Sequence, residues 1–390
     1  MPKQKNRKFI VFGAPRIEKD EINEVVKTLK SGWIGTGPKT AKFEQILSSY
    51  AGAKYAMAVN SCTAALHLSM IAVGIGPGDE VIIPAMTFCA TANAIIHTGA
   101  KPVFVDVKKS TMNIDPVFIE KAMTKKTKTI IPVHFAGRPC EMDQILKIAK
   151  KHKLIIIEDA AHAIGAEYYN KKIGNIGDAT CFSFYVTKNI TTAEGGMIIT
   201  NNKNFADKIK IYSLHGLTKD AWNRYSDEGY KHYQVVYSGF KYNMTDIQAS
   251  LGIHQMKKIK KYQKIRDKYW KIYNEGLSGL PLTLPAPPEK NTIHAKHLYT
   301  ILLDLDILKI SRDEFMEKLY RKGIGTGVHY IALNLHPYYQ KMLGYKKGDF
   351  PNAEYISERT VSLPFSPKLT IDDVKRIIRG VKSVVLAHQK

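Results

Sequence analysis

The sequence predicts an α/β protein built on a mainly parallel β-sheet with helices on both faces. From Lys54 onward, short runs of strand-like composition alternate with helix-length segments, and strand, helix, strand at this spacing is typical of crossover connections. A chain of 390 residues can bury a sizeable core, and this length favours two domains. We place a large domain at residues 1–245 and a connecting helix with a smaller domain at 246–390.

The alternation defines the individual elements of the large domain. The expected strands are Tyr55–Val59, Glu80–Pro84, Pro102–Val107, Thr129–Val133, Leu154–Glu158, Ala179–Val186 and Met197–Thr200, and the expected helices are Thr63–Val73, Thr87–His97, Asp115–Met123 and Met142–His152. Ligands of such sheets bind beyond the carboxyl ends of the strands, so the residues directly after each strand are the candidates for function.

The last third of the chain has its own pattern. Thr245–Glu275 is long enough to be the helix that leaves the large domain, and Pro281–Pro288, with four prolines, is expected to be a linker. The segments expected to form the smaller domain, which would close one side of the crevice, are Leu298–Leu305, Arg312–Lys322, Ala353–Thr360 and Ile371–Ala387.

Composition excludes several classes of protein. The formal net charge is +23, from 58 basic and 35 acidic residues, which favours anionic partners; the alternative is a lysine-rich solvated surface, because the lysines are spread along the chain without a nucleic-acid motif. The four cysteines, Cys62, Cys89, Cys140 and Cys181, lie far apart, which argues against a zinc site, an iron–sulfur cluster or a disulfide scaffold. With no apolar run long enough for a signal peptide or a membrane span, we expect a cytoplasmic protein without a metal.

The strongest candidate for chemistry is Lys188, which lies in a polar turn between two strand-like runs. Burying an unpaired ammonium group is expensive, so such a lysine either reaches water as a surface residue or has a chemical use. A second candidate is the segment Asn60–His67, whose small and hydroxylated residues begin a helix. Its free N–H groups could bind a phosphate, or the segment could be a simple helix cap.

Three further side chains follow strands of the same sheet. Phe88 comes after the strand at 80–84 and is either an aromatic wall of the crevice or a core residue. Asp159 follows a hydrophobic strand; because Glu158 and Asp159 are adjacent on a strand and face opposite ways, at most one of them should enter the site. Ser183 adds a hydroxyl five residues before Lys188. We find no P-loop, dinucleotide-binding, zinc-protease or nucleophile-elbow motif to compete with this group.

A lysine, a carboxylate, a phosphate cradle and an aromatic ring are the parts needed to hold pyridoxal phosphate. The lysine amine forms a Schiff base with the cofactor aldehyde. The carboxylate keeps the ring nitrogen protonated, so that the ring can accept electrons when a proton leaves the substrate carbon. The aromatic ring fixes the plane of the cofactor, and hydroxyl and amide groups bind its phosphate.

The same residues fall in segments that match a known family. These segments are Ser31–Gly37, Glu158–His162, Ser183–Asn189 and Gly239–Asp246, and the match covers nearly the whole chain. On them, the chain resembles the DegT/StrS nucleotide-sugar aminotransferases, which are fold-type I pyridoxal-phosphate enzymes. The resemblance implies an α/β large domain, a smaller C-terminal α+β domain and a homodimer with shared active sites.

The resemblance also assigns roles by position. It makes Lys188 the Schiff-base lysine and the acid/base that moves the substrate proton, Asp159 the partner of the ring nitrogen and Phe88 the stacking aromatic. It places His162 near the cofactor ring and implies phosphate contacts from Cys62, Thr63, Ser183 and, from the neighbouring subunit, Asn243. For the substrate it implies Trp33, Lys241 and His329.

The resemblance also indicates the reaction. Some family members carry histidine at the position of Lys188 and remove a hydroxyl group, so lysine favours transfer of an amino group from L-glutamate to a keto sugar. Lys241-Tyr242-Asn243, with residues 214–222 and 323–330, is most similar to the branch that forms UDP-4-amino-4-deoxy-L-arabinose, which implies a UDP-4-keto-pentose and the synthesis of cell-envelope glycans such as lipopolysaccharide. Phe88, where tryptophan also occurs, and Lys219, in place of arginine, are departures that could alter sugar fit.

Three alternatives stay open at this stage. The first is a dTDP- or GDP-linked 3- or 4-keto-6-deoxy sugar as the acceptor. The second is a sugar dehydratase on the same fold, which would need no stoichiometric glutamate. The third is a cofactor-binding regulator without catalysis, which would explain the positive charge by contact with nucleic acid.

Overall fold

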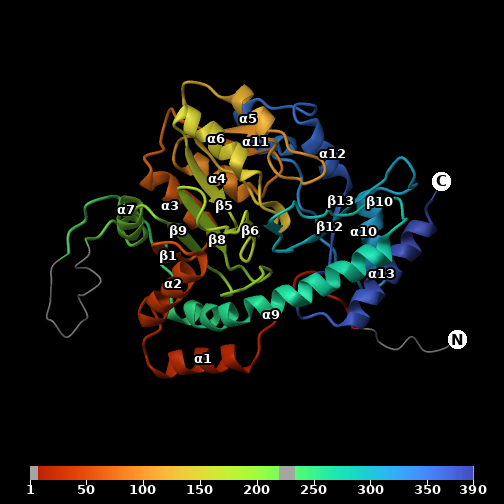
Figure 1. Cartoon of the computed structure of the whole chain (residues 1–390), viewed down its shortest axis with the longest axis horizontal. Coiled ribbons are helices and arrows are strands. Elements are labelled where there is room, and N and C mark those ends of the chain that lie inside the picture. The colour runs from red at the N-terminus through yellow and green to blue at the C-terminus, as the bar shows by residue number, and fades with distance from the viewer. Residues whose placement is uncertain (1–7, 219–232, 390) are drawn as a thin grey trace.

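The computed structural model describes residues 8–218 and 233–389, and it confirms the predicted α/β architecture. A seven-stranded sheet has the order β1-β9-β8-β5-β4-β2-β3. Figure 1 labels β1, β9, β8 and β5 of this sheet. β9 runs antiparallel to β1 and β8, and the other neighbouring pairs are parallel. The strands are β1 (Tyr55–Val59), β2 (Glu80–Pro84), β3 (Lys101–Val105), β4 (Thr127–Ile130), β5 (Ile155–Asp159), β8 (Ala179–Ser183) and β9 (Gly196–Thr200).

Helices cover both faces of this sheet. One face packs against α3 (Cys62–Ala72), α4 (Cys89–His97) and α7 (Lys203–Ser213), and the other against α2 (Pro38–Ala51), α5 (Pro116–Ala122), α6 (Met142–His152) and the first half of α9 (Asp246–Leu277). Successive side chains of a strand point to opposite faces of the sheet, so each face has its own core. Met57 and Val59 of β1 face the first group of helices, and Ala56 and Ala58 face the second.

Several predicted boundaries differ from the structure by one to three residues, and two of these differences bear on the site. The helix expected from Thr87 begins at Cys89, because Phe88 is the extended residue that precedes it. The strand expected to end at Val186 ends at Ser183, so that the chain turns before it reaches Lys188. Because the chain turns earlier than expected, Lys188 stays close to the carboxyl end of β8.

A smaller sheet forms a second core in the last third of the chain. β10 (Leu282–Thr283), β12 (Tyr299–Leu303) and β13 (Thr360–Leu363) pack with α10 (Arg312–Arg321), α13 (Ile371–Leu386) and the second half of α9. A third sheet joins β6 (Glu167–Tyr168), β7 (Lys171–Lys172) and β11 (Thr292–Ile293). The remaining α-helices in the described part of the chain are α1 (Lys19–Lys30), α11 (Pro337–Leu343) and α12 (Pro351–Arg359).

The long connecting helix α9 belongs to both cores. It begins with a capping box between Thr245 and Gln248, and its 32 residues correspond to about 48 Å. This packing supports the proposed division near residue 245. The segment expected at 353–360 behaves differently: Ala353 and Ile356 of α12 belong to the core of the large sheet, not to that of the small one.

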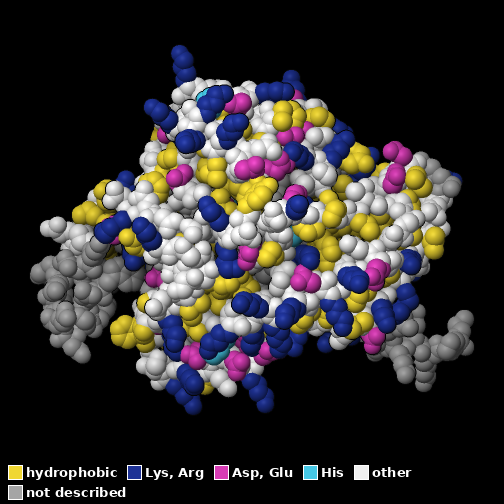
Figure 2. All heavy atoms as spheres, viewed as in Figure 1, with side chains coloured by type: hydrophobic (Ala, Val, Ile, Leu, Met, Phe, Trp, Pro, Cys, Tyr) yellow, Lys and Arg dark blue, Asp and Glu magenta, His cyan; other side chains and the backbone are white. Residues whose placement is uncertain are grey.

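The surface shows how the net positive charge is distributed. Figure 2 shows Lys and Arg side chains over the whole visible face, interspersed with Asp and Glu. None of the helices in the described ranges has the length and apolar character needed to cross a bilayer.

Candidate active site

A cavity of about 440 Å³ opens where β1, β2, β5 and β8 end, which is the edge at which the sequence predicts a site. Eight residues named from the sequence line it: Cys62, Thr63, Phe88, Asp159, His162, Ser183, Lys188 and His329. A volume of this size is typical of a site for a small-molecule ligand. The strand ends therefore bring together residues that are far apart in the chain.

Lys188 enters the cavity without a partner. Its backbone N–H donates to the carbonyl of Tyr185, which closes a turn directly after β8. Among the described residues, its ammonium group makes no hydrogen bond or ion pair. Loss of water around the amine lowers the pKa of Lys188 to about 8, although Cys62 and Asp159 act in the opposite direction. The lysine is therefore an accessible amine that is partly neutral near neutral pH.

We expect this lowered pKa to be measurable in the cofactor-free protein. With a pKa of about 8, roughly a quarter of Lys188 is neutral at pH 7.5, compared with about one part in a thousand for an ordinary lysine. Carbamylation by cyanate, followed at each lysine by peptide mass spectrometry, should therefore rise with a midpoint near pH 8 at Lys188. A midpoint above pH 10, as expected for an ordinary exposed lysine, would contradict this environment.

Asp159 lies at the end of β5 and is held in place by two donors. The hydroxyl of Thr91 donates to its Oδ2 at 2.8 Å, and the backbone N–H of Ala161 donates to its Oδ1 at 3.1 Å. Thr91 in turn shares a hydrogen bond of 2.9 Å with the hydroxyl of Thr87. Burial raises the pKa of Asp159, while these donors and Lys188 favour the charged form. The carboxylate is thus fixed in orientation and able to pair with a cation in the cavity.

Glu158 faces the other side of the sheet, as the alternation of the strand predicts. Its Oε2 lies 2.9 Å from Nε2 of His134, and its Oε1 accepts from the N–H of Gly177 and the hydroxyl of Thr180. Both partners of the His134 contact are fully buried. Glu158 is therefore structural, and the expectation that at most one of the two carboxylates enters the site is confirmed.

The N-terminus of α3 forms one wall of the cavity. Ser61 caps this helix by accepting from the N–H of Ala64 at 3.1 Å, and Cys62 and Thr63 supply its first turn. Gly196, at the start of β9, lies against this turn: a Cβ there would come within 2.4 Å of the carbonyl oxygen of Ser61. Only a glycine allows β9 to approach the start of α3 this closely. The N–H groups at the N-terminus of α3 can bind an anion.

Aromatic and histidine rings form the opposite wall. The ring of Phe88 is 57% exposed and lies 5.8 Å from the ring of Tyr330, so Phe88 faces the cavity and is not a core residue. His162 accepts from the N–H of Ala136 at Nδ1, and its Nε2 lies 3.1 Å from the hydroxyl of Tyr330. Because Nδ1 is an acceptor, we assign the ring proton to Nε2.

Both histidines of this wall are uncharged near neutral pH. Burial lowers the pKa of His162 well below its usual range, with a further contribution from Lys188. Burial likewise lowers the pKa of His329 to about 3, and its Nδ1 lies 2.9 Å from the hydroxyl of Ser362. His329, expected from the family resemblance to contact the substrate, lines the same cavity.

Three predicted site residues lie outside this cavity. Trp33 is 52% exposed and donates from its indole N–H to the carbonyl of Thr36. Lys241 is exposed, and Asn243 donates to the hydroxyl of Thr36 beside the end of β1. A single chain does not bring these side chains into the cavity. Lys219, also named from the sequence, lies outside the described residues.

The cavity also contains residues that the sequence alone did not single out. The additional lining residues include Ser61, Thr87, Thr91, Tyr185, Glu194, Gly195 and Tyr330. Ser61 and Gly195 were recognisable, because they flank the predicted helix start and strand start. Thr91 carried no signal, and Tyr330 was named only as the last residue of the segment 323–330, since their roles depend on contacts with residues 68 and 168 positions away.

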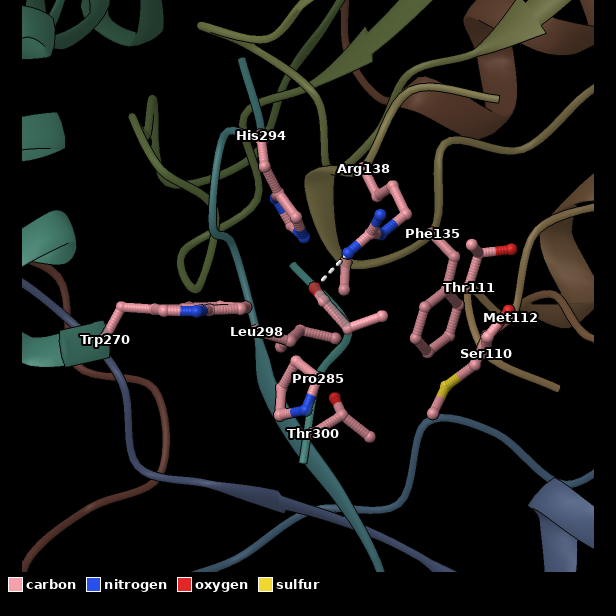
Figure 3. A pocket seen from close by; sticks show the side chains of 12 residues that line it. Ser110, Thr111, Met112, Phe135, Arg138, Trp270, Pro285, His294, Leu298 and Thr300 are labelled. Atoms are coloured by element: carbon pink, nitrogen blue, oxygen red, sulfur yellow. Dashed lines mark hydrogen bonds between the residues drawn. The ribbon is translucent and has the colours of Figure 1, made fainter. Parts of the chain in front are cut away.

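A second, smaller cavity separates the large sheet from the C-terminal third. It has a volume of about 30 Å³, enough for one or two water molecules but not for a cofactor. Figure 3 shows Arg138 reaching from the large domain toward the segment 285–289, with His294 and Trp270 beside it. Arg138 donates to the carbonyl groups of Ala286 and Pro287 and pairs with Glu289. This region is a closely packed seam between the two cores.

Comparisons with known proteins agree with this geometry. Residues 15–382 match the model of the DegT/DnrJ/EryC1/StrS aminotransferase family. The spore coat polysaccharide biosynthesis protein SpsC of Bacillus subtilis is 49% identical over 383 residues, which are 98% of this chain and 98% of SpsC.

Two solved structures extend the comparison. The PLP-form of Spr1654 from Streptococcus pneumoniae, a candidate sugar aminotransferase, is 36% identical, with a TM-score of 0.91 and coverage of 97% of this chain and 99% of that chain. Helicobacter pylori PseC, an aminotransferase involved in the biosynthesis of pseudoaminic acid, is 30% identical, with a TM-score of 0.90 and coverage of 97% and 100%.

Proposed function

Because this chain belongs to the DegT/DnrJ/EryC1/StrS aminotransferase family, we propose that it uses pyridoxal phosphate to transfer the amino group of L-glutamate to the keto carbon of a nucleotide-linked sugar. The observation that carries the proposal is the unpaired Lys188 amine, which shares a cavity with the fixed carboxylate of Asp159. The names of the relatives support it: Spr1654 has been solved in PLP and PMP forms, SpsC is named for the biosynthesis of a spore coat polysaccharide, and PseC for that of pseudoaminic acid.

The residues of the cavity fit this cofactor. Lys188 offers a primary amine with no competing partner, and the first turn of α3, which a Cβ at Gly196 would fill, offers N–H groups for a phosphate. Asp159 is placed to pair with a protonated ring nitrogen, and Phe88 presents an exposed aromatic face. When bound, pyridoxal phosphate supplies an aldehyde that condenses with amines and a ring that accepts electrons.

The protein's part of the reaction is to hold the reactants and to move one proton. Asp159 would keep a positive charge on the ring nitrogen. The burial of Asp159 strengthens this attraction, because few water molecules compete for the carboxylate. Nζ of Lys188, with its pKa lowered to about 8, is able to take a proton from the substrate carbon and to return it elsewhere. The neutral His162 accepts from the N–H of Ala136 and shares its Nε2–H with the hydroxyl of Tyr330, and these two bonds hold its ring on this side of the cavity.

The sugar is proposed from the family branch that the chain resembles. Lys241-Tyr242-Asn243 and the segment 323–330 favour a UDP-linked 4-keto-pentose, in the synthesis of cell-envelope glycans such as lipopolysaccharide. A dTDP- or GDP-linked 3- or 4-keto-6-deoxy sugar is the alternative acceptor. The four free cysteines favour a reducing compartment, and we propose the cytoplasm as the location.

A spectroscopic experiment tests both the function and the acceptor. Purified protein supplied with pyridoxal phosphate should be yellow, lose this colour with L-glutamate and regain it with the correct keto sugar. The recovery step should be measured over UDP-, dTDP- and GDP-linked 3- and 4-keto sugars. Recovery with the UDP-4-keto-pentose at the highest kcat/KM supports our assignment. Loss of water from a sugar without glutamate consumption would instead establish a dehydratase.

We also propose that the working enzyme is a homodimer with shared sites. Among the described residues that line the cavity, Lys188 is the one Lys or Arg, whereas the proposed ligands carry phosphates and carboxylates. Exposed Lys241, together with Asn243 and Trp33, lies outside the cavity of its own chain and is available to the cavity of a second copy. Sedimentation of the fully active holoenzyme as a monomer would contradict this arrangement.

A non-catalytic regulator remains the rival from another class. It would use the net charge of +23 to bind nucleic acid. The dispersed mixture of basic and acidic side chains in Figure 2 does not favour a nucleic-acid groove on that face. Steeply salt-dependent DNA binding without any exchange between glutamate and the cofactor would establish the rival.

A further inference from the structure

The residue that follows Lys188 is anchored to a distant part of the chain. The side chain of Asn189 is buried, and its amide Nδ2 donates to the carbonyl of Ala295 at 2.8 Å. Its Oδ1 lies 3.0 Å from Nδ1 of His297, 108 positions further along the chain. Because a carbonyl can only accept, the first bond fixes the amide orientation, and Oδ1 must accept from a protonated Nδ1 of His297.

His297 connects this anchor to the wall of the cavity. Its ring lies 4.4 Å from the ring of His162, which faces the site. Burial lowers the pKa of His297 well below its usual range, with further contributions from His162 and Lys188. A neutral ring with its proton on Nδ1 is therefore the form that matches the amide of Asn189.

The backbone around His297 is itself held by the large domain. The N–H groups of Ala295 and His297 donate to the carbonyls of Gly137 and Ala136, both at 2.8 Å. Gly137 has a φ of +93°, and a Cβ on it would come within 2.8 Å of the carbonyl oxygen of His162, so these segments touch. The fixed segment 295–297 can therefore act as a reference for the turn that carries Lys188.

Arg266 of α9 adds a support from the opposite side. It is buried, and its Nη1 donates to the carbonyls of Lys296 and His297 at 3.1 and 3.2 Å. No carboxylate pairs with it among the described residues; the other acceptor is the carbonyl of Phe365 at 3.3 Å. The segment 295–297 is thus clamped between α9 and the loop at 136–137.

We propose that Asn189 and His297 are positioning residues that hold the turn of Lys188 so that its amine stays in the cavity and away from bulk water. This inference rests on the proposed function, because it concerns the lysine that carries the cofactor. Neither side chain lines the cavity, so neither is a catalytic residue. Their contribution is to the geometry and the solvation of Lys188.

The test compares three variants with a matched control. Asn189→Ala removes both anchoring bonds, His297→Phe keeps a ring beside His162 but loses the donor, and His297→Asn restores a donor near the position of Nδ1. The control is Asn334→Ala, because Asn334 is another buried asparagine whose amide donates to the carbonyl of Lys346 and the carboxylate of Glu354, and not to the turn of Lys188 or the segment 295–297. All are prepared as the full chain with pyridoxal phosphate.

The first readout is the pH titration of the visible absorbance of the bound cofactor. A looser turn lets water reach the amine, so Asn189→Ala and His297→Phe should shift the midpoint to higher pH by about half to one unit. In the glutamate half-reaction, their kcat should fall about tenfold with KM little changed, because the amine is misplaced after binding. His297→Asn should bring the pH midpoint most of the way back to the wild-type value. Asn334→Ala should lower the melting temperature but leave the pH midpoint unchanged.

Coupling between the two residues gives the second readout. The double variant Asn189→Ala/His297→Phe should show about the same midpoint as Asn189→Ala alone, since that change already removes the contact that His297→Phe breaks. Additive shifts, or midpoints equal to wild type in both single variants, would overturn the proposal. Failure of the proposed function is distinguished by the wild-type protein: borohydride reduction followed by peptide mapping would then find no cofactor on Lys188.

Discussion

Replacing Lys188 with alanine is expected to reduce transamination between L-glutamate and the keto sugar by about 10⁴-fold or more, because this change removes both the amine that holds the cofactor and the base that moves the substrate proton. The measurement is the release of 2-oxoglutarate in the presence of the best keto sugar. The side chain has no hydrogen-bond or ion-pair partner among the described residues, so nothing else in the structure is lost with it.

The stability of this variant provides the control. Removing an unpaired, poorly hydrated ammonium group should leave the melting temperature of the cofactor-free protein equal to or above that of wild type. Lys260→Ala, at an exposed position of α9, should change neither activity nor stability. Retention of normal activity by a folded Lys188→Ala protein would remove the basis of the proposed mechanism.

Replacing Asp159 with asparagine is expected to lower kcat by about 10²- to 10⁴-fold while the protein keeps its fold. The amide has the same shape as the carboxylate, and the hydroxyl of Thr91 can adjust its hydrogen bond because it is also bonded to Thr87. What would be lost is the negative charge that, on the proposed function, pairs with the ring nitrogen, and such a charge is most effective in a buried site. Steady-state kinetics with saturating glutamate and keto sugar measure the change.

The neighbouring carboxylate offers a matched control. Glu158→Gln alters a side chain that is equally buried but faces His134, Gly177 and Thr180 on the other side of the sheet. It should cost about 2 kcal/mol of unfolding free energy, because a buried hydrogen-bond network is broken, and leave kcat within about twofold of wild type. If Glu158→Gln lowered kcat and Asp159→Asn changed only the stability, the active site would have to lie on the side of β5 that Glu158 faces.

The opposite outcomes expected for these adjacent residues also show what the sequence can predict. The alternation of a strand is a local property, so it predicted that Glu158 and Asp159 face opposite sides, and the structure confirms it. Parallel strands place their carboxyl ends at one edge, and this rule predicted that Cys62, Phe88, Asp159 and Ser183 would meet.

Contacts between distant segments could not be read in the same way. The hydrogen bond from Thr91 to Asp159 joins residues 68 positions apart, and the one between Asn189 and His297 joins residues 108 positions apart. No periodic pattern in the sequence predicts either contact. Boundaries moved for local reasons: Phe88 stays extended and delays α4 by two residues from the expected Thr87. The positions of Trp33, Lys241 and Asn243 relative to the cavity depend on a second chain, which a single sequence does not place.

The continuous helix α9 limits how this enzyme can move between its two half-reactions. Ile253 and Met256 are packed in the core of the large sheet, and Tyr273 and Leu277 in the core of the small one, so one stiff rod without an internal proline is fixed at both ends. A hinge that swings the two parts widely apart would have to break this rod. On the proposed function, the same cavity accepts a small amino acid and a bulky nucleotide sugar in turn, so its mouth must rearrange. Selectivity for the sugar would then reside in the segments at that rim rather than in a large closing motion.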